Sequence, residues 1–157
     1  MGVEIERKYL VNKVRWEQSG KGRRRFYRQG YILSDPIKTV RVRLSDTEAF
    51  LTIKGQTIGA IRLEYEYSIP KEEAKELLDN FCSSIIAKYR YEVQYGDKLW
   101  EVDEFLEDNE GLMVAEIELV NEQETFPLPD WVEREVTDEP KYYNANLAVH
   151  PYKSWKD

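Results

Sequence analysis

The chain has 157 residues and a formal net charge of −7, from 23 Lys and Arg against 30 Asp and Glu. This length suits one domain with a real hydrophobic core, so we treat residues 1–157 as a single domain. The acidic balance argues against general nucleic-acid binding, and the single cysteine excludes an internal disulfide or a multi-cysteine zinc site. We see neither a signal peptide nor a membrane span, and we expect a soluble cytoplasmic protein with no membrane partner.

Alternation of apolar and polar residues runs through most of the chain and predicts β-strands. The clearest strands are predicted at 3–9, 40–44, 61–67, 87–93 and 115–119, and weaker ones at 26–33, 49–54 and 98–105. Short turn signals such as Ser34-Asp35-Pro36 separate neighbouring strands, and turns this short join antiparallel strands only. The sequence therefore predicts about eight antiparallel strands.

One strong helix is predicted over 70–82, because Pro70 suits the first turn of a helix. The apolar residues that follow it at helical spacing are Ala74, Leu77, Leu78 and Phe81. Beyond residue 120 the pattern is mixed, and short helices are predicted near Asn121 and Asn144. The predicted fold class is mainly β, with a few peripheral helices.

The polar face of the predicted strands is almost entirely ionisable. Its acidic members are Glu4, Glu6, Glu64, Glu66, Glu92, Glu101, Asp103, Glu116 and Glu118. Its basic members are Lys8, Arg28, Arg41, Arg43, Lys54, Arg62, Lys88 and Arg90. Parity places apolar residues such as Ile5, Val42 and Leu63 on the opposite face.

Two structures would satisfy this pattern. In the first, an open sheet packs its apolar face on helices and turns its charged face to water. In the second, about eight strands close into a barrel with the charged face inward, which leaves room for one small ligand. The apolar exterior would then be covered by the 70–82 helix, by C-terminal elements or by a partner subunit. Alternation by itself does not decide between the two structures.

A charged interior would have to be compensated, because buried charges are paired or bound to ions. Arg and Lys bind phosphate oxygens, and surplus carboxylates hold Mg²⁺ or Mn²⁺, which prefer oxygen ligands. The reactions that combine these parts are phosphoryl transfer and nucleotide cyclisation. We therefore expect a small polyanionic substrate, bound together with a divalent cation.

The charged motifs follow one another in a distinctive order. The first is the ExExK pattern Glu4-Ile5-Glu6-Arg7-Lys8. The motifs that follow are Tyr27-Arg28-Gln29-Gly30-Tyr31, Val40-Arg41-Val42-Arg43, Thr52-Ile53-Lys54-Gly55, Arg62-Leu63-Glu64-Tyr65-Glu66, Lys88-Tyr89-Arg90, Glu101-Val102-Asp103 and Glu116-Ile117-Glu118. This order closely resembles the CYTH family, also called the triphosphate tunnel metalloenzymes, over residues 2 to about 150. The chain looks like a compact bacterial member.

The resemblance implies an eight-stranded antiparallel closed barrel and a metal-dependent hydrolase that cleaves the terminal phosphoryl group of a triphosphate, most often inorganic triphosphate. By motif, it assigns the metal ion to Glu4, Glu6 and Glu118, with assistance from Glu116. The candidates for phosphate binding are Lys8, Arg28, Arg41, Arg43, Lys54, Arg62, Lys88 and Arg90. The catalytic candidates are Lys8, Glu64, Glu66, Asp103 and Lys141, the last as the base that activates water. Where eukaryotic relatives carry a third Glu on the last strand, this chain has Val120.

Other functions remain open at this point. An adenylate cyclase, a thiamine triphosphatase or a nucleoside triphosphatase would use the same metal and phosphate sites. A non-catalytic polyphosphate-binding module would bind without turnover, and a lipocalin-like carrier would turn its apolar face inward. We expect no stable nucleic-acid partner, and an apolar exterior would also suit a homodimer. Trp100, Trp131 and Trp155 are expected to cover that exterior.

Overall fold

The computed structural model describes residues 2–20 and 22–155. Its strands are β1 (Gly2–Val11), β2 (Arg24–Ser34), β3 (Thr39–Leu44), β4 (Ala49–Lys54), β5 (Ile61–Ile69), β6 (Ile85–Tyr95), β7 (Lys98–Phe105), β8 (Met113–Glu118) and β9 (Val132–Glu135). Its helices are α1 (Lys13–Gln18), α2 (Lys71–Phe81) and α3 (Asn144–Val149), and its 3₁₀ segments are η1 (Glu107–Asn109), η2 (Pro140–Tyr142) and η3 (Tyr152–Ser154). Within the described residues, no helix is long and apolar enough to cross a membrane.

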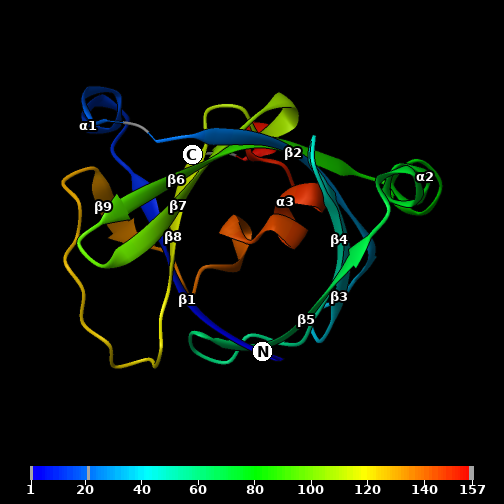
Figure 1. The fold of residues 1–157 in the computed structure, drawn as a ribbon, viewed down its shortest axis with the longest axis horizontal. Coiled ribbons are helices and arrows are strands. Elements are labelled where there is room, and N and C mark those ends of the chain that lie inside the picture. Colours follow the sequence, from blue (N-terminus) through cyan, green and yellow to red (C-terminus); the bar gives the residue numbers. More distant parts are fainter. Residues whose placement is uncertain (1, 21, 156–157) are drawn as a thin grey trace.

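The sheet closes on itself. The strand order is β5-β4-β3-β2-β6-β7-β8-β1-β9, and β1 also pairs with β5 to complete a ring of eight strands (Figure 1). Strand β1 is shared along its length, because Val3 lies opposite Leu63 of β5 while Glu6 lies opposite Glu118 of β8. All the pairings are antiparallel, so the predicted closed barrel is confirmed and the open-sheet alternative is wrong.

The eight predicted strands and the helices predicted over 70–82 and near Asn144 are all present. The helix predicted near Asn121 is wrong. The side chain of Asn121 accepts a hydrogen bond from the backbone N–H of Gln123 at 2.9 Å, and the backbone turns there instead of continuing into a helix. Helix α1 and strand β9, which the sequence pattern does not predict, are only six and four residues long. Elements this short carry too few residues to establish a period.

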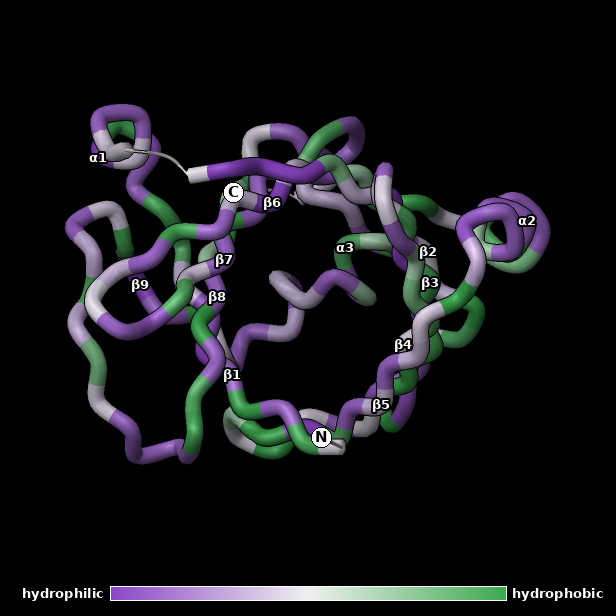
Figure 2. Tube along the Cα trace, in the orientation of Figure 1, coloured by the Kyte–Doolittle hydropathy of each residue, from purple (hydrophilic) through white to green (hydrophobic). Residues whose placement is uncertain are grey.

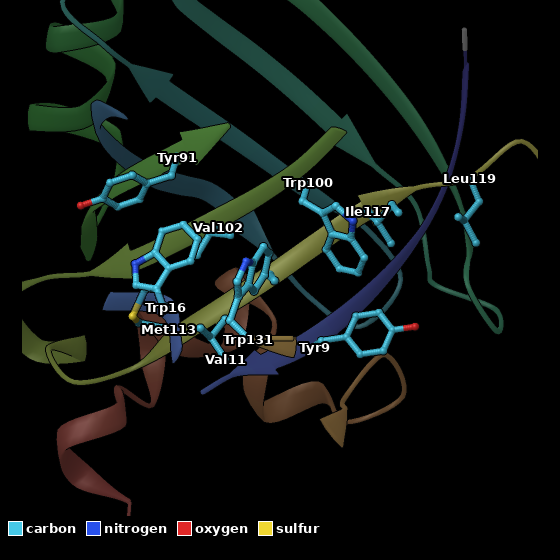
Figure 3. Close-up of a cluster of buried hydrophobic side chains, with 11 residues drawn as sticks. Tyr9, Val11, Trp16, Tyr91, Trp100, Val102, Met113, Ile117, Leu119 and Trp131 are labelled. Atoms are coloured by element: carbon cyan, nitrogen blue, oxygen red, sulfur yellow. The ribbon is translucent and has the colours of Figure 1, made fainter. Parts of the chain in front are cut away.

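The largest hydrophobic cluster lies on the outer face of the barrel, against β1, β6, β7 and β8 (Figure 3). Trp16 of α1 and Trp131 pack edge to face with ring centroids 5.1 Å apart, and Trp131 packs on Trp100 of β7 at 5.8 Å. The predicted outer position of Trp100 and Trp131 is therefore confirmed. Trp155 instead packs on Tyr142 and Tyr152 in a separate cluster near the end of the chain.

A second outer cluster lies under α2, whose buried residues Ala74 and Leu78 pack with Val42 and Ala49 of the barrel wall. The spacing of these two residues on α2 is the helical spacing on which the prediction of the helix was based. Helix α2 therefore covers a part of the wall formed by β2, β3 and β4.

One end of the barrel interior is closed by the C-terminal segment. Viewed along the barrel, η2 and α3 lie within the ring of strands (Figure 1). Leu147 and Tyr142 are buried there against the inward side chains of Ile86, Phe105 and Val114. Hydrophilic and hydrophobic residues otherwise mix along the barrel strands (Figure 2). The rest of the interior is lined mainly by polar and charged side chains.

Candidate active site

The barrel encloses a cavity of about 650 Å³. The basic residues that line it are Lys8, Arg41, Arg43, Lys54, Arg62 and Arg90. The acidic residues that line it are Glu4, Glu6, Asp35, Glu64, Glu66, Glu101 and Glu116. The ionisable strand face thus points inward, while Ile5 and Val42 pack in the outer clusters and Leu63 is exposed. This placement rules out the lipocalin-like carrier with an apolar interior.

On one side of the cavity, cations and carboxylates form a buried network. The Nζ of Lys8 donates to Glu116 at 2.7 Å, and Arg90 contacts both Asp103 at 2.7 Å and Glu116 at 3.1 Å. Burial acts to raise the pKa of Glu116, but Lys8 and Arg90 outweigh it and hold that pKa well below its usual range. These charges are therefore largely neutralised by one another.

Two of the predicted site residues lie behind Arg90, outside the lining of the cavity. Lys88 is fully buried and donates to Asp103 at 2.7 Å. Burial and the nearby Arg90 lower the pKa of Lys88 to about 7. Burial acts to raise the pKa of Asp103, but Arg90 and Lys88 lower it to about 2. We read this pair as support for Arg90, because Arg90 is the member that lines the cavity.

A second set of pairs lies where β1, β4 and β5 meet. The Nζ of Lys54 is 3.2 Å from Glu4 and 3.4 Å from Glu64. Burial raises the pKa of the Glu64 carboxyl, and the charge of Glu4 adds to that shift. Lys54 therefore bridges two carboxylates that repel each other.

Three cavity arginines differ from these cations, because neutral groups supply their close contacts. Arg43 donates to the amide oxygen of Gln29 at 3.3 Å, and Arg62 donates to the backbone oxygen of Gly55 at 2.6 Å. Arg41 donates to Thr52 at 3.3 Å, and its contact with Glu66 is longer, at 3.8 Å. Among the described residues, the Nε of Arg41 is buried without a hydrogen-bond partner. These guanidinium groups retain donors for an anion.

Both the sequence and the fold of this chain are similar to those of known proteins. A family model described as the CYTH domain matches residues 2–152. The chain belongs to the CYTH family. It is 49% identical over 158 residues to an inorganic triphosphatase of Acetivibrio thermocellus, with 100% of both chains covered.

More distant CYTH relatives agree over nearly the same length. The chain is 34% identical over 152 residues to an inorganic triphosphatase of Nitrosomonas europaea, covering 94% of this chain and 97% of the relative. It is also similar to the crystal structure of an inorganic triphosphatase, with a TM-score of 0.66, 32% identity and coverage of 93% of this chain and 94% of the other. The resemblance found from the motifs is thereby confirmed.

CYTH triphosphatases are typically metal-dependent, so we asked whether this cavity suits a divalent cation. Glu4, Glu6 and Glu118 offer carboxylate oxygens, the donors that Mg²⁺ and Mn²⁺ prefer. Burial raises the pKa of Glu6 well above its usual value, and the charges of Glu116 and Glu4 add to the shift. Burial likewise raises the pKa of Glu118, with Glu4 and Glu101 contributing. A cation would relieve this repulsion, so the residues fit the ion.

The carboxylates do not form a complete cage by themselves. In the described part of the chain, no three acidic, histidine or cysteine residues lie close enough to enclose an ion. Glu116 is engaged by Lys8 and Arg90. Glu118 lies on β8 opposite Glu6, but it is exposed and is not among the residues that line the cavity. A divalent cation bound by one or two carboxylates commonly completes its coordination with water and substrate phosphates. The arrangement is therefore one in which an ion and a phosphate substrate would bind together.

Two candidates lie away from the cavity. Arg28 lies on the outer face, in a separate depression with Lys71 of α2, because the inward positions of β2 are Tyr27, Gln29 and Tyr31. Lys141 is exposed, with its Nζ 4.8 Å from the ring centroid of Trp155. We therefore keep neither residue in the proposed site.

The sequence analysis left several cavity residues without a role. Glu101 lies opposite Glu116 on the neighbouring strand and carries the same inward parity as Asp103, which could have identified it. Tyr143 and Asn144 reach the cavity from the C-terminal segment, which has no strand period. The hydroxyl of Tyr143 donates to the backbone oxygen of Thr137 at 2.7 Å, and this bond fixes the segment near Lys8.

Proposed function

We propose that this chain is a metal-dependent inorganic triphosphatase, in which water cleaves the terminal phosphoanhydride bond of inorganic triphosphate. The observation that carries the proposal is a cavity in which arginines with neutral partners share the space with mutually repelling carboxylates. The relatives named inorganic triphosphatases, which match along nearly the whole chain, support the same activity. The products are diphosphate and orthophosphate.

In this proposal, Arg41, Arg43 and Arg62 bind the phosphate oxygens. Their planar guanidinium groups suit bidentate contacts with phosphate, and they spend few of their donors on protein partners. Lys8 and Arg90, held by Glu116 and Asp103, add fixed positive charge to the same cavity lining. The substrate would thus be held from several strands at once.

Mg²⁺ or Mn²⁺ is the cofactor of this proposal, with one or two carboxylates from among Glu4, Glu6 and Glu118 as the protein ligands and Glu116 beside them. When bound, such an ion supplies charge neutralisation at phosphate oxygens. Glu64 and Glu66 hold Lys54 and Arg41 in place. Asp103 does the same for Arg90.

Catalysis then consists chiefly of positioning and charge stabilisation. Phosphoryl transfer passes through a loose transition state, in which charge is spread over the oxygens of the transferred phosphoryl group and develops on the leaving oxygen. The oxygen of water forms the new bond to phosphorus, and the bridging oxygen departs with diphosphate. The proton that water loses passes to a phosphate oxygen or to solvent. Fixed guanidinium groups inside a largely enclosed cavity stabilise that charge without reorganising.

The lining also favours an inorganic substrate. Among the described residues, Tyr31 and Tyr143 are the aromatic side chains that line the cavity, and no pair of stacked rings is present to receive a base. A nucleotide would therefore gain little beyond its phosphates. This preference separates the proposal from the thiamine and nucleoside triphosphatases and from the adenylate cyclase.

A substrate panel tests the proposal directly. The purified chain is incubated with inorganic triphosphate, thiamine triphosphate, ATP or diphosphate, each with Mg²⁺ and with Mn²⁺, and the released orthophosphate is measured. We expect the highest kcat/KM on inorganic triphosphate and no release without a divalent cation. Cyclic AMP as the main product from ATP would overturn the assignment in favour of a cyclase. Tight binding with uniformly negligible turnover would leave a binding module instead.

A further inference from the structure

Arg43 is a cavity cation whose close partners are neutral. Its Nε donates to Gln29, and its guanidinium carbon lies 5.1 Å from the ring centroid of Tyr27. Among the described residues, no carboxylate oxygen lies within 4.0 Å of its nitrogens. Burial and the charges of Arg41 and Arg90 lower the pKa of Arg43 to about 10. The fold therefore maintains a positive charge there with little local compensation.

Gln29 connects this guanidinium to the element that closes the cavity. Its side chain is fully buried, and it lies opposite Arg43 in the pairing of β2 with β3. While its Oε1 accepts from Arg43, its Nε2 donates to Oδ1 of Asn144 at 3.2 Å. Asn144 begins α3 and lines the cavity, whereas Gln29 does not. Gln29 would therefore act on a ligand only through its two neighbours.

The neutral amide contrasts with the carboxylates that hold other cations of the cavity. Lys8 is held by Glu116 and Arg90 by Asp103, and in each case a carboxylate fixes the cation and offsets its charge. An amide oxygen also fixes the direction of a guanidinium, but it leaves the full positive charge for a ligand. The bond to Gln29 uses one of the five N–H donors of Arg43.

We propose that Gln29 is a positioning residue for phosphate recognition, which holds the Arg43 guanidinium toward the cavity without neutralising it and links that orientation to the seating of α3. The inference rests on the proposed function, because it takes phosphate oxygens as the partner of Arg43. It predicts that adding a carboxylate at position 29, with almost no change of shape, is harmful.

The test is Gln29→Glu. We measure the affinity for inorganic triphosphate by calorimetry without divalent cation, and KM and kcat with it. Because the new carboxylate would pair with Arg43, we expect Kd and KM to rise by about tenfold or more, with kcat changed by less than about threefold. Gln123→Glu makes the same chemical change at an exposed position and is expected to match the wild type.

A double-mutant cycle identifies the route of the effect. If Gln29 acts through Arg43, Gln29→Glu should change Kd by less than about twofold once Arg43 is replaced by alanine. Equal effects of Gln29→Glu with and without Arg43 would overturn the inference. If Gln29→Glu does not fold, Gln29→Met, which removes the acceptor oxygen at similar size, replaces it in the same cycle.

The outcomes separate the two proposals. A wild-type chain that binds inorganic triphosphate but does not hydrolyse it contradicts the proposed function, and the binding cycle still tests Gln29. A wild-type chain that hydrolyses it, with an unchanged Kd and KM in Gln29→Glu, contradicts only the role of Gln29. A wild-type chain that does neither contradicts both.

Discussion

At the scale of single residues, the cavity divides its cations into two kinds. Lys8, Lys54 and Arg90 are held by carboxylates, whereas Arg43 and Arg62 are held by amide, hydroxyl or backbone oxygens. Paired cations fix the shape of the wall, and unpaired ones remain available to a phosphate. The acids that pair with cations therefore differ in what their loss should change: Glu4 should affect turnover, and Asp103 should affect stability.

Glu4 is the acid for which binding and turnover should separate. In Glu4→Gln we expect kcat to fall by at least about 100-fold, since a proposed metal ligand is lost. Affinity for inorganic triphosphate without divalent cation should hold or increase, because Lys54 loses a carboxylate partner. Phosphate release and calorimetry measure the two quantities. Unchanged turnover in Glu4→Gln would argue for a different set of metal ligands.

Asp103 should contribute to stability in a pH-dependent way. Its pKa in the folded chain, about 2, lies below the ordinary value of 3.8, because Arg90 and Lys88 outweigh the effect of burial. A lowered carboxyl pKa stabilises the fold above pH 4, and this stabilisation is lost as the pH falls toward 2. The shift corresponds to roughly 2 kcal/mol.

Chemical denaturation of the wild type and of Asp103→Asn between pH 5 and 2 measures this effect. The variant should be less stable at pH 5, because two buried cations lose their partner, and it should lose less stability on acidification. Asp46→Asn, at an exposed position, should keep the pH dependence of the wild type. Parallel pH profiles for Asp103→Asn and the wild type would contradict the assignment.

At the scale of elements, α3 depends on a small apolar contact. Leu147 is fully buried among Ile86, Phe105 and Val136, although α3 has only six residues. A helix this short is held by packing and not by its own propensity. The seating of α3 therefore determines whether the cavity is closed at this end.

Leu147→Ala should lower the free energy of unfolding by about 2–5 kcal/mol, because it leaves a cavity in a packed cluster. Val149→Ala, on the same helix but largely exposed, should cost less than about 0.5 kcal/mol. Denaturant titration of both variants measures the difference. Equal, small effects would mean that α3 is not anchored through Leu147.

The elements that the sequence predicted are those with a sustained period. Alternation identified eight strands, and helical spacing identified α2, because one face of each is apolar over several turns or pleats. The segment after residue 119 lacks such a pattern. The placement of β9 depends on its pairing with β1 and on contacts that are distant in sequence, such as the hydrogen bond from the Asn12 backbone to the Trp131 oxygen at 2.7 Å.

The site was predictable where charge and parity agree, as for Glu4 and Arg41. It was not predictable where they disagree. On β2 the charged residue Arg28 has outward parity, and the inward positions hold Tyr27 and Gln29, so charge was a misleading guide there. Closure of the barrel also lay beyond the alternation, since both an open sheet and a barrel satisfy it. The family resemblance supplied that part.

At the scale of the whole molecule, one outer wall has no covering element among residues 2–20 and 22–155. Helix α1 and the segment after β8 pack on β1, β6, β7 and β8, and α2 packs on β2 to β4. Outward residues of β1, β4 and β5 remain exposed: Val3 (51%), Ile53 (41%), Leu63 (54%), Tyr65 (47%) and Tyr67 (54%). Their exposed area is on the order of 500 Å², which is the size of the largest apolar patch on many proteins, and such patches are often functional.

We expect this wall to pair with the same wall of a second copy as a homodimer. The area approaches the roughly 800 Å² per partner of a standard interface, and the patch carries no charge that would oppose its own copy. Light scattering after size exclusion should give twice the chain mass for the wild type. The double variant Leu63→Lys, Tyr67→Lys, which places two charges in the patch, should give the mass of the monomer. The control variant Leu128→Lys, at an exposed position outside the patch, should remain a dimer. A monomeric wild type at micromolar concentration would contradict the expectation.

The central claim is that the charged cavity hydrolyses inorganic triphosphate by means of a divalent cation. Orthophosphate release from inorganic triphosphate, measured with Mg²⁺, with Mn²⁺ and with a chelator, tests it most directly. We predict multiple turnovers with at least one of the two ions and none with the chelator. Turnover that persists in the chelator, or no turnover with either ion by a folded chain, would contradict it.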